Sequence, residues 1–419
     1  MKIYLLIPVF AIIIADVTAK KKYARDESDD YESTEQDSSK AFDLRGTLRQ
    51  HFGLIASLRD PDENGVCSPI SALLPLGKLA LGAQGAGLKE LNKAIGVSSD
   101  DELDEDYSDE HSESVLEKHL SDLIESLRDL EGVTLDVASR LYISNDKRLF
   151  KNYTKAAKRI FKTSIEKADF NEPITVAKSV NDWVALKTHG MIPEIISPQD
   201  VSPRSSLLIV NAIYFAGKWE HPFGEVAPGT FYSPKRDKKV FMMTNTAWYY
   251  YKDSKTLSAQ LIRIPYVGAK SSFLIVLPNE KSGLQSLLKR LKRNPKLLAQ
   301  AVDGMKSTNI QLTMPKFRIE SQWDLGDLYR NIGLSSVFDR RKSGLTGIVR
   351  DEKLAVSAAI QKAVIEVNEL GTKAAASSVV VIWKYLLPDI PHFKADHPFL
   401  FFVLSANQQL FSGAYVEPN

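Results

Sequence analysis

Histidine and cysteine are the side chains best suited to acid–base, nucleophilic or metal chemistry near neutral pH, and this 419-residue chain has seven histidines and one cysteine. The histidines are scattered along the sequence, at His51, His111, His119, His189, His221, His392 and His397. The single cysteine, Cys67, rules out an intramolecular disulfide framework and any cysteine-based zinc or iron–sulfur cluster. We therefore expect no metal site and no cofactor.

Short catalytic motifs do not occur in the sequence either. It contains no G-x-S-x-G elbow, no H-E-x-x-H pair and no Walker A loop. The glycine-rich stretch 82–87 follows a helical pattern rather than a strand, which argues against dinucleotide binding. A Ser-His-Asp triad is not a local pattern, so a triad built from distant residues stays open at this stage, although nothing recommends one.

Three clusters of basic residues offer a different chemistry, the binding of a polyanion. They span residues 155–162, 235–239 and 289–293, and each could bind a sulfated polysaccharide through charge. No aromatic platform accompanies them, which favours ordinary solvated faces. The whole chain has 54 Lys and Arg against 52 Asp and Glu, and this near-neutral balance excludes a chain-wide nucleic-acid footprint.

The first 19 residues have the pattern of a secretory signal peptide. Lys2 precedes an uncharged apolar run, residues 3–15, and residues 17–19 supply the small side chains that a signal peptidase reads. The run is too short for a comfortable membrane span, and no later window approaches ~18 apolar residues. We expect a secreted, extracellular protein without a membrane anchor, in which Asn152 of an N-x-T sequon would be a glycosylation site.

Two acidic stretches are expected to lie outside the folded core. Seven acidic residues occur between Asp26 and Asp37, with Tyr31 the only aromatic residue among them. We interpret residues 20–40 as a disordered leader, or as an acidic arm that docks on a basic surface. Residues 100–113 carry nine carboxylates between two helical patterns, which is typical of an inserted surface loop.

The elements that must position any site fall into two groups. A buried helix is predicted over 70–91, with Ser68 as its N-cap, and an amphipathic helix over 177–189. Strands are predicted over residues 206–215, 240–251, 259–265, 272–278, 309–319, 399–404 and 410–416. Helices followed by strands, without regular alternation, indicate an α+β fold. Length alone suggests two or three domains of about 150 residues, or one large domain.

Residues 371–398 do not have the pattern of a core element. A run of small residues, 371–378, precedes the apolar and β-prone stretch 379–387, and prolines follow. As an exposed edge such a stretch would promote aggregation. As a strand inserted between two others it would bury one face of small, then β-branched side chains. That face consists of Thr372, Ala374, Ala376, Ser378, Val380 and Ile382.

Six motifs, in order along residues 41–419, resemble those of the serpin family. They are NGVCSPIS (64–71) with LGA (81–83), NDWV (181–184) with THGMI (188–192), VNAIYFAGKW (210–219), MPKF (314–317), VIEVNE (364–369) and HPFLF (397–401). The resemblance implies a serpin fold with three β-sheets, about nine helices and an exposed reactive-centre loop, residues 369–397. It also implies that residues 41–419 form one domain.

The resemblance further implies a function that needs no catalytic residue. A serpin offers a scissile bond in its reactive loop to a serine protease, which attacks it with its own nucleophile and forms an acyl-enzyme. The cleaved loop then inserts as an extra strand of the central sheet and distorts the trapped protease. We expect a secreted, monomeric serine protease inhibitor that acts as a suicide substrate and is not an enzyme.

Positions that match the serpin family imply the parts of this mechanism. The loop hinge is matched by Glu369, Gly371, Thr372, Ala374, Ala375 and Ala376. A polar shutter beneath the opening strands is matched by Ser68, Ser71, Asn211 and Gln361, and the breach at the top of the sheet by Trp219. Many relatives have histidine where this chain has Gln361, so we expect no pH control of opening at that position.

Spacing places the scissile bond. Tyr385 lies 16 residues after Glu369, the usual inhibitory spacing, so cleavage before Leu386 is favoured, and the aromatic side chain suits a chymotrypsin-like protease. A loop shorter by one residue would put Lys384 there, with cleavage before Tyr385, and would suit a trypsin-like protease. Two alternatives stay open: a non-inhibitory serpin that is a carrier, chaperone or signalling ligand, and an inhibitor of a papain-like cysteine protease.

Overall fold

The apolar run that starts at Ser206 forms β4, Leu207–Gly217, in the middle of a five-stranded sheet. All 11 residues of β4 are buried, as expected for a strand that is covered on both faces. The computed structural model describes residues 63–418 apart from 98–114, 126, 128–129, 163–164, 295, 351–352, 372–389 and 406–407. These residues all belong to one compact unit, Phe42–Asn419.

The elements of the described residues confirm the α+β fold class. The α-helices are α2 Pro69–Ala80, α3 Gly85–Ile95, α4 Val115–Glu125, α5 Lys151–Phe161, α6 Pro173–Lys187, α7 Leu284–Arg293, α8 Lys296–Asp303 and α9 Leu325–Asn331. The strands are β1 Gly65–Cys67, β2 Val133–Ser144, β3 Glu166–Ala168, β4, β5 Glu225–Phe231, β6 Lys238–Ser254, β7 Ala259–Pro265, β8 Ser271–Pro278, β9 Lys306–Pro315, β10 Phe317–Asp324, β11 Ala358–Val367, β12 His392–Lys394, β13 Phe399–Ser405 and β14 Gln408–Tyr415. Short 3-10 helices occur at Pro198–Asp200 and Ser336–Phe338.

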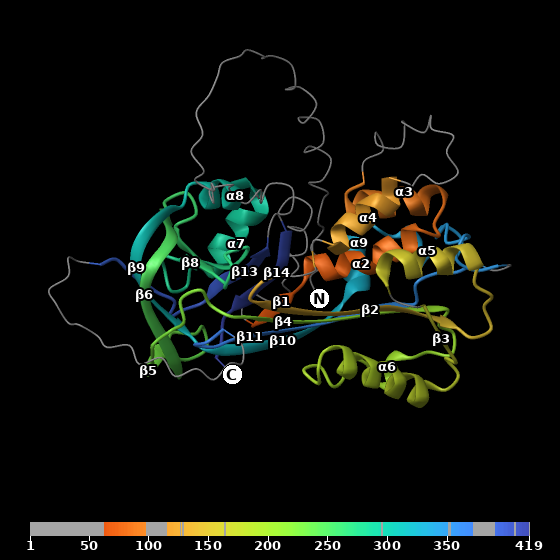
Figure 1. Ribbon diagram of the computed structural model, residues 1–419, viewed down its shortest axis with the longest axis horizontal. Helices are drawn as coiled ribbons and strands as arrows, with labels where there is room; N and C mark the ends of the chain where they lie inside the picture. Colours follow the sequence, from red (N-terminus) through yellow and green to blue (C-terminus); the bar gives the residue numbers. More distant parts are fainter. Residues whose placement is uncertain are drawn as a thin grey trace, which may run out of the picture. The chain divides into compact units, whose positions relative to one another are not determined.

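The five-stranded sheet has the order β10-β11-β4-β2-β3. Its pairs β11/β4 and β2/β3 are parallel, and its other two pairs are antiparallel. Figure 1 shows α6 on one side of this sheet and α2 on the other. On the α6 side, Val180 and Val184 share a core with Val210 of β4 and Val364 of β11. This double cover explains why β4 is apolar almost throughout and why seven of the ten residues of β11 are apolar.

The remaining strands form a nine-stranded sheet, β1-β14-β13-β8-β7-β6-β9-β12, with β5 paired to β6. Three separate sheets were expected, whereas the described strands form two. The reason is the length of β6, whose residues 238–244 pair with β5 while residues 250–254 pair with β7. One continuous strand thereby joins two sheets that the prediction had kept apart.

Two predicted elements turn out to be divided. The helix predicted over 70–91 breaks into α2 and α3, and at Gly82 an added Cβ would lie 2.4 Å from Ile348 Cγ1, so the turn packs closely on a neighbouring segment. The strand predicted over 309–319 is β9 followed by β10, with Lys316 between them. The predicted N-cap is confirmed, since Ser68 Oγ accepts a hydrogen bond from Ser71 N at 3.3 Å. Among the described helices none is long and apolar enough to span a bilayer.

Candidate functional site

The strands β4 and β11 are parallel neighbours in the five-stranded sheet, and this pair is called the seam below. It runs in register from Ala358↔Leu208 to Ile365↔Phe215. Just beyond β11 lie Asn368, Glu369 and Gly371, after which the description of the chain stops until residue 390. The segment predicted to be the reactive loop therefore starts at the end of a seam strand.

Three of the predicted shutter residues lie together beneath the seam, on the α2 side. Gln361 of β11 accepts a hydrogen bond from Ser68 N at 3.1 Å through Oε1. Its Nε2 donates to Ser68 O at 3.0 Å and to Ser71 Oγ at 2.9 Å. All three side chains are buried, so these neutral hydrogen bonds replace the water that the polar groups have lost.

The fourth predicted shutter residue reaches α2 from the other side of the seam. Asn211 of β4, in register with Gln361, donates from Nδ2 to the main-chain oxygen of Ser71, and to Ser71 Oγ at 3.3 Å. Its own Oδ1 is buried without a hydrogen-bond partner. Ser71 is thus bonded to both strands of the seam, and one helix links the two strands that would have to separate.

Trp219 closes the end of the seam where the hinge begins. Its indole Nε1 donates to Asn368 O at 2.7 Å, and its ring is stacked on Tyr266 with centroids 4.6 Å apart. Phe223 and Phe273 meet the same ring edge-on. An indole that is buried in an aromatic cluster and bonded to the main chain of Asn368 fixes the residue that precedes the predicted hinge.

Glu369 is held by both its carboxylate and its main chain. Its carboxylate pairs with Lys316 Nζ at 2.5 Å, and its main-chain oxygen accepts from Phe223 N at 2.9 Å. The hydrogen bond from Lys316 lowers the pKa of the Glu369 carboxyl below its usual value. Sequence reasoning missed the role of Lys316, although this lysine lies in the quoted MPKF motif.

Gly371 occupies a position that only glycine fits. Its φ of +87° is in the left-handed region, and an added Cβ would lie 2.0 Å from Gly217 O and 2.3 Å from the Cα of Lys218. The chain therefore reverses direction here while in contact with the end of β4.

The remaining predicted loop residues lie outside the described part of the chain. They are the hinge residues Thr372, Ala374, Ala375 and Ala376 and the scissile-bond candidates Lys384, Tyr385 and Leu386. Their assignments stay predictions. The structure brings together, around one seam, the described members of the same set: Ser68, Ser71, Asn211, Trp219, Gln361, Glu369 and Gly371.

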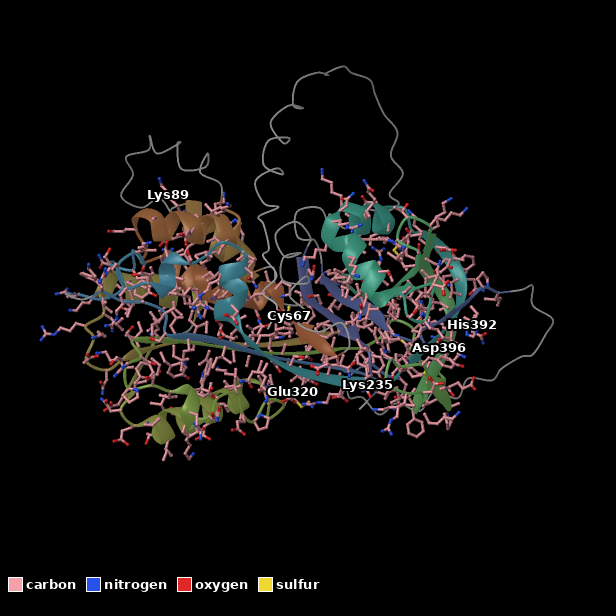
Figure 2. All side chains as sticks on the ribbon, turned by 180° about the vertical axis from the view of Figure 1, so that it is seen from behind. Cys67, Lys89, Lys235, Glu320, His392 and Asp396 are labelled. Atoms are coloured by element: carbon pink, nitrogen blue, oxygen red, sulfur yellow. The ribbon has the colours of Figure 1, made fainter. Side chains whose placement is uncertain are left out.

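Ligands for a metal ion are not gathered at one place in the described residues. No cluster of three or more His, Cys, Asp and Glu side chains suited to a metal ion occurs there. Cys67 is buried, and burial raises the pKa of its thiol to about 12, so it is an inert core residue (Figure 2). Asn152 is exposed at the start of α5, so the side chain is accessible for the predicted glycan.

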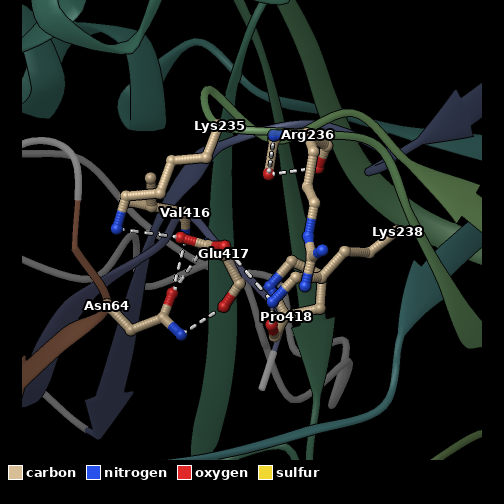
Figure 3. A network of polar contacts seen from close by, with 8 residues as sticks. Asn64, Lys235, Arg236, Lys238, Val416, Glu417 and Pro418 are labelled. Carbon is tan, nitrogen blue, oxygen red and sulfur yellow. Dashed lines mark hydrogen bonds and ion pairs between the residues drawn. The ribbon is translucent and has the colours of Figure 1, made fainter.

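The three basic clusters differ in how far their side chains are already bonded to other parts of the protein. In cluster 235–239, Lys235 and Lys238 both pair with the Glu417 carboxylate at 3.2 Å (Figure 3). The side-chain oxygen of Asn64 also accepts hydrogen bonds from the main-chain N–H groups of Val416 and Glu417. In cluster 289–293, Arg290 donates to Leu257 O at 2.6 Å. Pairing with the C-terminal tail weakens cluster 235–239 as an anion site, which leaves α5 and α7 as the more accessible basic helices.

Comparison with known proteins agrees with this geometry. The chain matches the family described as Serpin (serine protease inhibitor) over residues 51–418. It is 36% identical to antichymotrypsin-2 of Bombyx mori over 362 residues, covering 85% of the chain and 92% of that protein, and 35% identical to antitrypsin of the same organism over 365 residues, covering 85% and 89%. A crystal structure of a highly specific serpin from the insect Tenebrio molitor is similar with a TM-score of 0.77 at 26% identity, covering 90% of this chain and 97% of that one.

Proposed function

The chain belongs to the serpin family and is a serine protease inhibitor rather than an enzyme, and from this premise we propose that it is a secreted suicide substrate. In this proposal a target protease cleaves the loop between residues 369 and 397, and the loop then inserts into the seam. Residues 1–19 would direct secretion. The partner would be an extracellular serine protease, with a chymotrypsin-like enzyme favoured by Tyr385 and a trypsin-like enzyme by Lys384.

The observation that carries the proposal is the parallel pairing of β4 with β11. A chain that reverses at Gly371 and runs back beside β11 is antiparallel to β11, and also to β4, because the two strands point the same way. Insertion would replace one parallel interface with two antiparallel ones, which are more stable per residue. The parallel pairing therefore supports the proposal, because a strand inserted at the seam would gain the more stable antiparallel pairing on both sides.

The covalent step uses the nucleophile of the protease. Its serine hydroxyl adds to the carbonyl carbon of Tyr385 and gives its proton to the general base of the protease. The peptide bond to Leu386 then breaks, and the protease transfers the proton to the released amine of Leu386. The product is an ester between the protease and Tyr385. Insertion of the residues before Tyr385 would carry the esterified protease away from its cleavage position before water can hydrolyse the ester.

The direct test is incubation of the full chain with chymotrypsin, trypsin and papain in separate reactions. We expect an SDS-stable complex with one of the two serine proteases, and N-terminal sequencing of the released C-terminal fragment to begin at Leu386, or at Tyr385 if Lys384 is the specificity residue. Quantitative loop cleavage without any complex would contradict suicide inhibition and favour a non-inhibitory member of the family. A complex with papain alone would indicate a cysteine protease target.

Thr372→Arg is the matched loss-of-insertion variant, because a charge would then enter the buried face of the inserting strand. Burial of an unpaired guanidinium costs several kcal/mol, roughly, so insertion should fail while the loop stays cleavable. We expect cleavage without a complex. Lys373→Arg changes the opposite face of the same strand and should inhibit like the wild type. Inhibition by Thr372→Arg at the wild-type rate would overturn the loop assignment.

A sulfated polysaccharide is a second partner that we propose for the basic helices. Helix α5 carries Lys155 and Lys158 as exposed residues, and α7 carries Lys289 and Lys292. Heparin should then raise the association rate with the protease in a salt-dependent way. An association rate that heparin does not change would remove this part of the proposal.

A further inference from the structure

One row of residues crosses four strands on the α2 side of the five-stranded sheet. Ser139 of β2 is in register with Asn211, and Asn211 with Gln361. Gln361 is in turn in register with Trp323 of β10. Each of the four makes a hydrogen bond to the segment 66–78, which contains most of α2. The predicted shutter is therefore the middle of a longer row.

The first half of this segment is tied to the β10–β11 side of the seam. Trp323 Nε1 donates to Val66 O at 2.7 Å, and the Tyr329 hydroxyl of α9 donates to Ala72 O at 2.6 Å. The bonds of Gln361 add to these. Because of these bonds, we expect α2 to stay with β11 when the seam opens.

On the β4–β2 side, the side-chain hydrogen bonds found for the described part of α2 are those of Asn211 and Lys78, in addition to apolar packing. Lys78 Nζ donates to Ser139 O at 2.5 Å and to Ser139 Oγ at 3.2 Å, and it lies 5.2 Å from the centre of the Phe161 ring. Lys78 is only 3% exposed, and within the described residues it forms no ion pair. Burial without an ion pair makes the protonated form of such an amine unfavourable.

The charges around Lys78 do not compensate for its burial. Burial, and then the like charge of Arg140 on β2, lower the pKa of Lys78 to about 7. From α5, the Tyr153 hydroxyl donates to Lys78 O at 3.0 Å, and burial raises its pKa, so it carries no charge near neutrality. Two further charged residues, Arg159 of α5 and Glu117 of α4, form an ion pair with each other at 2.7 Å.

We propose that Lys78 is a positioning residue for opening of the seam: it is the arm of α2 that holds strand β2, and its protonation loosens that arm. β2 and β4 pair over 11 residues and should move as one body when β4 leaves β11. Ser139 then moves away with them, and Lys78 loses its acceptors and gains access to water. This inference rests on the proposed function, since insertion is what requires the seam to open.

The direction of the pH effect follows from the two protonation states. The closed sheet favours neutral Lys78, and the hydrated amine of the open sheet has a pKa closer to its usual value. Between pH ~10 and pH ~7 the open state alone binds the proton, so opening becomes easier as pH falls, by at most about tenfold per pH unit, and levels off below pH ~7. No pH control was expected at Gln361, and the titratable group is instead Lys78 of α2, bonded to Ser139 at one end of the row.

The test measures opening without a protease. A fluorescent synthetic peptide with the sequence of residues 372–382 is added to the full chain, and its rate of incorporation is followed from pH 6 to pH 9. For the wild type we expect a rate that rises several-fold, and by at most about 50-fold, between pH 9 and pH 7. For Lys78→Met, which removes the titrating group, the profile should be flat to within about twofold.

Two further variants keep the result interpretable. Lys78→Gln retains a neutral donor for Ser139 and should give a flat profile near the wild-type rate at pH 9, which also covers the case that Lys78→Met does not fold. Lys89→Met changes an exposed lysine on α3 (Figure 2) and should keep the wild-type profile. Parallel pH profiles for wild type and Lys78→Gln would overturn the inference even if an SDS-stable protease complex forms. A missing protease complex with a Lys78-dependent peptide profile would overturn only the proposed function, and no peptide incorporation at any pH would overturn both.

Discussion

The two sheets of this protein bury different kinds of side chain on the faces that matter most. Beneath the seam of the five-stranded sheet lie hydroxyl and carboxamide groups of Ser71, Asn211 and Gln361, paired with one another. The nine-stranded sheet instead packs Phe273 on Phe401 and Phe231 on Tyr415, with ring centroids 5.4 and 5.0 Å apart. Buried neutral hydrogen bonds exchange for water at a net gain of about 1 kcal/mol each, whereas buried aromatic pairs gain both area burial and ring contacts.

This difference separates a part of the molecule that can change partners from a part that cannot. Hydrogen bonds beneath the seam can be remade with an incoming strand, because their geometry is local and both partners are polar. Interdigitated rings can only be separated at the cost of a cavity. The comparison predicts that substitutions in the aromatic region lower global stability, and that substitutions at the seam change the ease of opening.

The largest expected effect is that of Phe401→Ala. Phe401 is fully buried against Phe273, so its truncation should lower the free energy of unfolding by about 3–5 kcal/mol. Urea unfolding measures the loss, and Phe241→Ala, at a side chain that is 63% exposed on β6, is the control with an expected change below about 0.5 kcal/mol. Peptide incorporation per folded molecule should be unchanged. A faster incorporation would mean that the two sheets do not behave as separate parts.

Asn211→Ala tests the other side of the comparison. It removes two hydrogen bonds to Ser71, one of the links across the seam, and we expect a loss of about 1–3 kcal/mol together with faster peptide incorporation. Asn171→Ala, at an exposed asparagine before α6, should change neither quantity. If Asn211→Ala lowers stability and leaves the incorporation rate unaltered, the seam is ordinary core and the comparison fails.

Much of this division could be read from the sequence. Motifs identified Ser68, Ser71 and Asn211, the family resemblance added Gln361, and the structure brings the four into contact. The strands β7, β8 and β13 were placed to within one residue, since uninterrupted β-prone runs bounded by prolines or small residues are strong local signals.

What the sequence could not supply depended on register. Lys78 looks like one polar interruption in an apolar helix, and only the alignment of Ser139 with Asn211 shows that it extends the polar row. Long-range ladder contacts of this kind have no local sequence signal. The same holds for Lys316, whose partner Glu369 is 53 residues away, and for the merging of two predicted sheets by the length of β6.

Gly371→Ala should have an effect of similar size at the end of the seam. Its positive φ is shared by Gly190, but an added Cβ meets Gly217 O at 2.0 Å in the first case and nothing within 4 Å in the second. Gly190→Ala should therefore cost only the backbone term, about 1 kcal/mol, and Gly371→Ala clearly more, about 2–3 kcal/mol. Thermal unfolding of both variants measures the difference. Equal losses would show that the hinge does not press against the end of β4.

The smallest expected effect belongs to Lys316→Gln, which breaks the pair with Glu369. Both side chains are about one-third exposed, so solvent screens the pair and the loss should be only about 0–1 kcal/mol. The pKa of Glu369 is lowered in the folded state, so the contribution of the pair is present above the ordinary carboxyl pKa and is lost as pH falls through the lowered value. The difference in melting temperature between wild type and Lys316→Gln should therefore be constant from pH 8 to pH 6 and vanish in acid. Lys178→Gln, in a more exposed pair with Asp182, is the control and should show a smaller difference throughout. Glu369 is the first residue of the predicted hinge. A difference in melting temperature that persists in acid would therefore mean that Lys316 holds this segment by packing. The end of the seam would then resemble the aromatic region rather than the polar row.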